Sequence, residues 1–151
     1  MYHPIRLTTA ILAAVGLVSS LPAMAAEHST QAGQYTIHHN AFTADTLSPD
    51  VARAYGFQRS KHRGLLNVSV VKEQPGTTGT STPAAVDVAI VNITGQKSPI
   101  PMREIKDQEA VYYLGEFPVY NQQTINFEIQ VKPQGDGEFH SVKMSQEFFT
   151  D

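Results

Sequence analysis

The sequence contains no cysteine and no tryptophan. Without cysteine, the chain can form no disulfide, and it has no thiol for nucleophilic catalysis or thiolate metal binding. Basic residues are also few, because 11 Lys and Arg stand against 14 Asp and Glu. A protein that binds nucleic acid or an anionic membrane over its whole surface needs a broadly basic surface. We therefore expect no nucleic-acid partner.

Long hydrophobic runs are absent except for one near the N-terminus, Leu7 to Val18. Arg6 precedes this run, and Ala23-Met24-Ala25 follows it, which is the three-part layout of a secretory signal peptide. Twelve helical residues cover about 18 Å, whereas the hydrocarbon layer of a membrane is about 30 Å thick. The sequence therefore predicts a signal peptide over residues 1–25, cleavage after Ala25, export to the periplasm and no integral membrane span.

The segment after the predicted cleavage site is polar and small in composition, so residues 26–34 are expected to form a flexible lead-in. A single domain is predicted over residues 35–151. Its first strand begins at Tyr35 and places Ile37, His39 and Ala41 on the same face as Tyr35. A two-turn helix follows, with Ser48 as N-cap, Pro49 at the first helical position and Gly56 as the C-terminal cap.

Alternation of apolar and polar residues is clearest from Thr124 to Lys132, where Ile125, Phe127, Ile129 and Val131 would point inward. Further strands are predicted over residues 65–72, 86–93, 99–105, 111–120 and 139–149, the last with His140, Val142, Met144, Gln146 and Phe148 on one side. Residues 73–83 read as a surface loop. About seven strands with one short helix indicate an all-β fold, an antiparallel immunoglobulin-like β-sandwich.

One segment, Val51 to Lys72, carries five Lys and Arg residues and no Asp or Glu. Arg59, Lys61 and Arg63 are spaced by two, so an extended chain would place them in one positive row. Such a row can receive a carboxylate, a phosphate or the acidic face of a partner. The alternative is that these charges pair with acidic residues of the chain and discourage aggregation at a strand edge. We predict Arg59, Lys61 and Arg63 as the binding residues.

Several short stretches resemble a family of short exported proteobacterial proteins known as a domain of unknown function. They are Ala52-Arg53-Ala54-Tyr55-Gly56, Arg59-Ser60-Lys61 and Gly64-Leu65-Leu66-Asn67-Val68-Ser69-Val70, with Gln146 and Phe148 near the C-terminus. The resemblance covers essentially all of the chain after the signal peptide. It implies a periplasmic location and an immunoglobulin-like sandwich, and it carries no catalytic residue or substrate.

The candidate metal ligands are histidines and methionines. His38 and His39 are adjacent, so on a strand they point to opposite faces and cannot share one ion. We expect a surface histidine and a hydrogen-bonded one. His140 with Met144 and Met102 offers imidazole and thioether donors, soft enough for Cu(I), although Met144 is expected in the core.

The predicted cleavage site gives a second possibility for metal binding. Cleavage after Ala25 would place His28 third from a free amine, in the sequence Ala26-Glu27-His28. Amine, two backbone amides and imidazole form a square-planar site suited to Cu(II) or Ni(II). Neither arrangement is strong enough to assign a metal or a cofactor.

The function predicted from the sequence is therefore non-catalytic. No nucleophile motif such as Gly-x-Ser-x-Gly is present, and no Gly-rich loop has the spacing of a phosphate-binding loop. We expect a periplasmic binding or accessory domain that contacts a protein or an envelope component. The first alternative is a periplasmic copper or nickel binding protein, and the second is an enzyme of another type.

Overall fold

The computed structural model describes residues 28–151, and the predicted signal peptide lies outside them. The described residues form one α-helix, one short 3-10 segment and ten strands. In chain order these are β1 (Ser29–Ala32), β2 (Tyr35–Thr43), η2 (Ala44–Thr46), α1 (Pro49–Tyr55), β3 (Arg63–Lys72), β4 (Thr80–Ser81), β5 (Ala84–Val91), β6 (Lys97–Ile100), β7 (Arg103–Asp107), β8 (Ala110–Pro118), β9 (Gln123–Pro133) and β10 (His140–Phe148).

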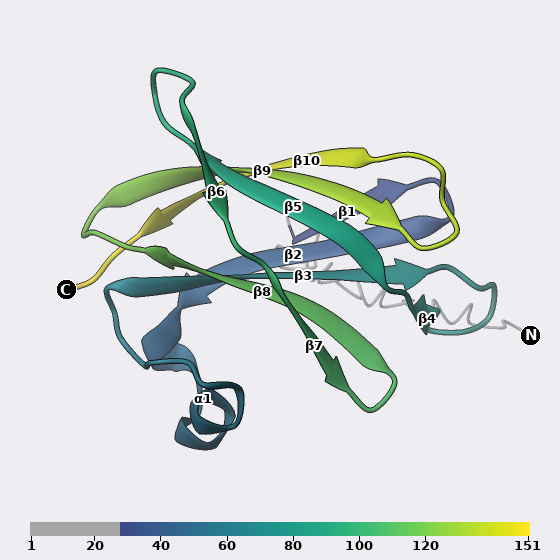
Figure 1. The fold of residues 1–151 in the computed structure, drawn as a ribbon, viewed down its shortest axis with the longest axis horizontal. Coiled ribbons are helices and arrows are strands. Elements are labelled where there is room, and N and C mark those ends of the chain that lie inside the picture. The colour runs from purple at the N-terminus through teal and green to yellow at the C-terminus, as the bar shows by residue number, and fades with distance from the viewer. Residues whose placement is uncertain (1–27) are drawn as a thin grey trace, which may run out of the picture.

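The strands form two antiparallel sheets that lie face to face (Figure 1). The first sheet has the order β1-β2-β3-β8-β7, with β4 paired to β3, and the second has the order β10-β9-β5-β6. The predicted all-β antiparallel sandwich with one short helix is confirmed.

The main core fills the space between the two sheets. The predicted alternation on β9 is confirmed, since Ile125, Phe127, Ile129 and Val131 are all at most 2% exposed. From the opposite sheet, β2 and β3 supply inward residues such as Ile37 and Val68, which are fully buried. Burying these side chains provides the main stabilising term of the fold, at about 1.5–3 kcal/mol for each large apolar side chain.

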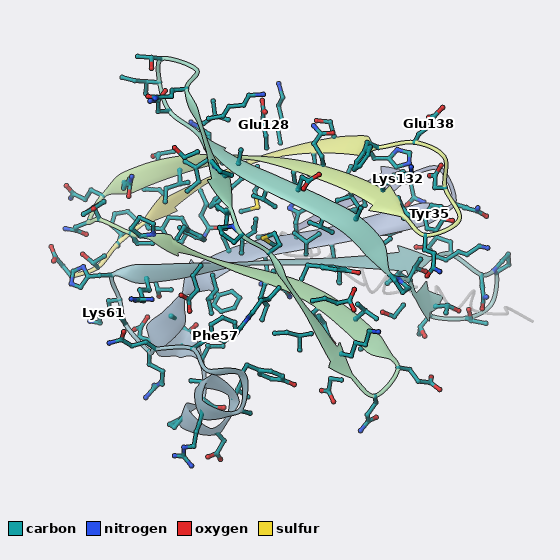
Figure 2. The ribbon with its side chains drawn as sticks, viewed as in Figure 1. Tyr35, Phe57, Lys61, Glu128, Lys132 and Glu138 are labelled. Atoms are coloured by element: carbon teal, nitrogen blue, oxygen red, sulfur yellow. The ribbon has the colours of Figure 1, made fainter. Side chains whose placement is uncertain are left out.

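A second, smaller core lies on the outer face of the first sheet, under α1 (Figure 1). The helix has the predicted caps: the Ser48 side chain accepts a hydrogen bond from Val51 N, and Gly56 is left-handed at φ 72°. The chain then returns to the sheet and places Phe57 against Leu65 and Ile105 (Figure 2). The outer face of β3 is therefore also buried, which explains why Leu65 and Leu66 are both fully covered.

Some strand boundaries differ from the sequence prediction. The single strand predicted over residues 99–105 is two strands, because the chain leaves β6 in one sheet and enters β7 in the other (Figure 1). Pro101 lies between them, and a proline cannot donate to a strand ladder. Ile93, predicted at the end of a strand, lies in the turn after β5 and is fully exposed.

Two short strands were also missed. Part of the segment predicted as a flexible lead-in forms β1, which pairs with β2 at the edge of the first sheet. Part of the loop predicted over residues 73–83 forms β4. Both strands are polar, and they are held by backbone hydrogen bonds that side-chain periodicity does not reveal. These strands and the β6 to β7 division account for ten strands where about seven were predicted. Within residues 28–151, no helix is long and apolar enough to cross a membrane.

Candidate functional site

Arg59, the first of the three predicted binding residues, is engaged within the chain. Its Nε donates to the backbone carbonyl of Leu47 at 2.7 Å, and its Nη2 donates to that of Asp45 at 2.9 Å. These two bonds hold the connection between η2 and α1 against the loop that follows the helix. Arg59 therefore has a structural role.

Lys61 and Arg63 do not form the row that an extended chain would give. The chain turns here, because Ser60 Oγ accepts from His62 N at 3.1 Å and Ser60 O accepts from Arg63 N at 3.4 Å. Arg63 then makes an ion pair with Glu116 of β8 at 3.0 Å. Lys61 points outward from the loop (Figure 2). It makes no hydrogen bond or ion pair with any of residues 28–151, so it is the member of the set best placed for a partner.

Arg103 was not predicted and lies beside a depression of about 370 Å³ next to α1. Its Nη2 donates to the carbonyl of Tyr55 at 2.7 Å, and its guanidinium carbon lies 4.3 Å from the centre of the Phe57 ring. A cation at a helix C-terminus stabilises the helix dipole, and stacking on an aromatic ring adds to this. Through these two contacts, Arg103 of β7 holds the C-terminal end of α1 against the sheet.

A contact between a histidine and a methionine bridges the two sheets at the opposite edge of the sandwich. His39 of β2 and Met144 of β10 both point inward, and His39 Nδ1 lies 3.3 Å from Met144 Sδ. His39 is only 4% exposed, and Met144 is half-buried against the main core. The two residues are 105 positions apart in the chain. Together they place an imidazole and a thioether at one point.

The second ring nitrogen of His39 also has a partner. His39 Nε2 lies 3.2 Å from the hydroxyl oxygen of Thr30 on β1. A hydroxyl can accept a hydrogen bond as well as donate one, so Nε2 can carry the ring proton and leave the lone pair of Nδ1 directed at Met144. Burial lowers the pKa of His39, and neighbouring His28 and His38 lower it further. The imidazole is therefore neutral at pH 7, which is the form that binds a metal ion.

An open cavity of about 570 Å³ lies beside His39. Its walls come from the residue before β1, from β2 and from β10, and they are His28, His38, His39, Asn40, Ala41, Ser145 and Gln146. Gln146 closes one end by donating from Nε2 to the carbonyl of Ala41 at 2.9 Å. Met144 also faces a neighbouring depression of about 340 Å³ that includes Glu128. His39 and Met144 thus each line an open depression.

The donor types at this contact fit copper. Thioethers are soft donors that suit Cu(I), and imidazole suits copper as well as zinc, iron and nickel, so a copper ion is compatible with both donors. The 3.3 Å separation of the two atoms is less than two typical metal bonds, about 2.1 Å to nitrogen and about 2.3 Å to sulfur. One ion can therefore contact both. Within residues 28–151, no three His, Asp or Glu side chains are grouped to hold a metal, so a site here requires the methionine.

The structure separates the metal ligands considered from sequence. His38 is exposed and His39 is buried with a hydrogen bond, as predicted. The combination of His140, Met144 and Met102 does not form. His140 bonds to Asp136 at 2.7 Å instead, and the sulfur of Met102 lies beside Gly115. Of the Ala26-Glu27-His28 motif, only His28 lies within the described residues.

Comparison with known proteins gave one family and several solved structures. A family model described as a domain of unknown function, DUF4426, matches residues 29–151. The crystal structure of a DUF4426 family protein from Pseudomonas aeruginosa is 30% identical with a TM-score of 0.68, and the match covers 82% of this chain and 94% of that one. No curated protein gave a significant match.

Two structures of FetP from uropathogenic Escherichia coli are also similar in fold. FetP isolated after expression in the periplasm is 11% identical with a TM-score of 0.56, covering 80% of this chain and 92% of FetP. A copper-bound FetP variant is 12% identical with a TM-score of 0.59, covering 83% and 97%. At such low identity the similarity shows a shared fold.

Proposed function

The chain belongs to the DUF4426 family, as its sequence resemblance indicated, and we propose that it is an exported, non-catalytic binding protein that holds a copper ion between its two sheets. The observation that carries this proposal is the 3.3 Å contact between His39 Nδ1 and Met144 Sδ, two residues that each line an open depression. The signal-peptide layout of residues 1–25 supports export to the periplasm. The sandwich fold shared with FetP, of which a copper-bound variant is known, agrees with this proposal.

The surroundings of His39 favour holding an ion over proton transfer. Both ring nitrogens are engaged, one with Thr30 and one with Met144, so the ring orientation is fixed. A metal-binding histidine is commonly oriented by a hydrogen bond from its other ring nitrogen, and Thr30 provides the partner for such a bond. When bound, the metal would supply a link between the sheets, and His39 and Met144 would be its ligands.

The experiment is a titration of the purified protein with Cu(I) under reducing conditions, against a competing chelator. We expect one ion per chain. Met144→Leu keeps the volume and the apolar character of the side chain but removes the sulfur, so the fold should persist while the affinity for Cu(I) falls at least about tenfold. Met102→Leu makes the same change at a methionine that packs against the core away from His39, and it should bind as the wild type does.

Two results would overturn this proposal. One is a wild-type protein that does not bind Cu(I). The other is equal affinity in wild type and Met144→Leu, which would mean that the thioether is not a ligand. A melting temperature measured with and without the metal provides a second readout, because an ion that binds only the folded chain stabilises it.

A further inference from the structure

His28 lies one residue before β1 and beside His39. The antiparallel pairing of β1 and β2 ends at Ser29, which is opposite His38. His28 directly precedes Ser29 and has a 3-10 conformation, so it lies where the chain enters β1, next to the position of His39. Thr30, two residues further along the chain, contacts His39. The pairing of β1 with β2 therefore brings His28 close to His39.

A shared cavity also places His28 at this site. His28 and His39 both line it, and His28 is exposed. His28 can therefore approach an ion held by His39, and its exposed side chain is free to turn because no partner for it is found among residues 28–151.

Resting on the proposed copper site, we infer that His28 supplies the third donor and that the site holds copper in its monovalent state. Two imidazoles and a thioether form a neutral donor set. Soft sulfur donors suit Cu(I), whereas hard divalent ions such as Mg²⁺ and Ca²⁺ prefer carboxylate oxygens. Among residues 28–151, the walls of the cavity beside His39 contain no carboxylate. The nearest acidic side chain on the neighbouring depression, Glu128, is paired with Lys97 at 2.7 Å.

This donor set joins three strands. His28 directly precedes β1, His39 belongs to β2 and Met144 to β10, so a bound ion would link the edge of one sheet to the edge of the other. β1 is only four residues long and lies at the edge of its sheet. Occupancy of the site should therefore protect the backbone of β1 from hydrogen exchange, while strands at the far edge such as β7 should be unaffected.

The test is a titration with Ag(I), a soft monovalent ion that undergoes no redox change under these conditions, on the wild type and two variants. His28→Gln removes the proposed donor from an exposed position, so the fold should be retained. We expect an affinity for Ag(I) lower by about tenfold or more, because losing even a hydrogen-bond partner of a metal ligand typically costs at least about tenfold. His38→Gln is the matched control, because His38 lines the same cavity but projects from the other face of β2, and it should bind as the wild type does.

The outcomes separate this inference from the proposed function. If the wild type binds no Ag(I) and no Cu(I), the copper site itself is wrong. If Met144→Leu loses affinity but His28→Gln does not, the copper site stands and His28 is not a ligand. A loss in His38→Gln with none in His28→Gln would also refute the role of His28. Equal affinities for Zn²⁺ and Cu(I) would refute the monovalent preference.

Discussion

Gly64 provides the sharpest test of the packing between the sheets. It lies opposite Phe117 in the pairing of β3 with β8, and the Phe117 ring occupies the space where a side chain would be. A Cβ atom added at Gly64 would lie 2.2 Å from one ring carbon and 2.3 Å from another. The ring or the strand would have to move by about 1.2 Å to restore an ordinary contact near 3.4 Å. Gly64→Ala is therefore expected to destabilise the fold.

The size of the effect follows from what surrounds the ring. Phe117 is 4% exposed and meets two other aromatic rings edge to face, Phe127 at 5.1 Å and Phe148 at 5.6 Å. Overpacking of a core typically costs about 1–3 kcal/mol, and each aromatic pair is worth about 0.5–1.5 kcal/mol. We expect Gly64→Ala to lower the free energy of unfolding by about 2–4 kcal/mol, measured as a lower urea midpoint with an unchanged slope.

Two further variants make the reasoning refutable. Gly137→Ala adds the same methyl group where nothing lies within 4 Å, so it should change stability by less than about 0.5 kcal/mol. Phe117→Leu removes the ring that would clash, so Gly64→Ala should be less harmful in that background, by about 1 kcal/mol or more. The same loss in both backgrounds would show that the contact with Phe117 is not the cause.

Three other predictions concern charge and export. A hydrogen bond to His140 lowers the pKa of the Asp136 carboxyl in the folded protein below its usual value of 3.8. The ionised carboxylate therefore stabilises the fold at pH values above about 3.8, and this stabilisation is lost as the pH falls through the lowered pKa. Asp136→Asn should therefore have a lower urea midpoint than wild type at pH 7 but not at about pH 2, and equal midpoints at pH 7 would contradict this. Lys61→Glu should weaken capture of an envelope partner, most strongly at low salt, and should leave the urea midpoint unchanged. Arg59→Glu should lower the urea midpoint, because two backbone carbonyls lose their hydrogen-bond donor. Sequencing of exported protein should find Ala26 or a near neighbour at the N-terminus, and intact Met1 in a membrane fraction would oppose the signal-peptide prediction.

Features set by local sequence were predicted well. The helix α1 has Ser48 and Gly56 at its ends because each residue satisfies a local backbone requirement. The β9 strand shows its buried face directly, because one side packs on the opposite sheet and the other faces solvent. Neither prediction depends on knowing which segments pair.

Features set by pairing between distant segments were missed. The polar strand β1 exists because β2 offers it an edge, and nothing in Ser29 to Ala32 reveals this. The predicted row of Arg59, Lys61 and Arg63 does not form for a related reason. The Ser60 hydroxyl accepts a hydrogen bond from His62 N and the chain turns there, so the segment lacks the extended conformation that would align residues spaced by two. Arg59 and Arg63 then bond to groups brought near by the fold, two backbone carbonyls and Glu116.

The copper site combines both kinds of information. The sequence places His39 on the same face of its strand as Ile37 and Ala41, and it predicts that one histidine of the adjacent pair is hydrogen-bonded. It also places Met144 on the inward face of the last strand. It does not show that these two faces meet, because β2 and β10 lie in different sheets and the partners are 105 residues apart. With the ring proton on Nε2, both Nδ1 and the thioether sulfur are acceptors, so no hydrogen bond joins them. An ion that binds both the Nδ1 lone pair and the sulfur would give each acceptor a partner, which is a physical reason for a metal at this contact.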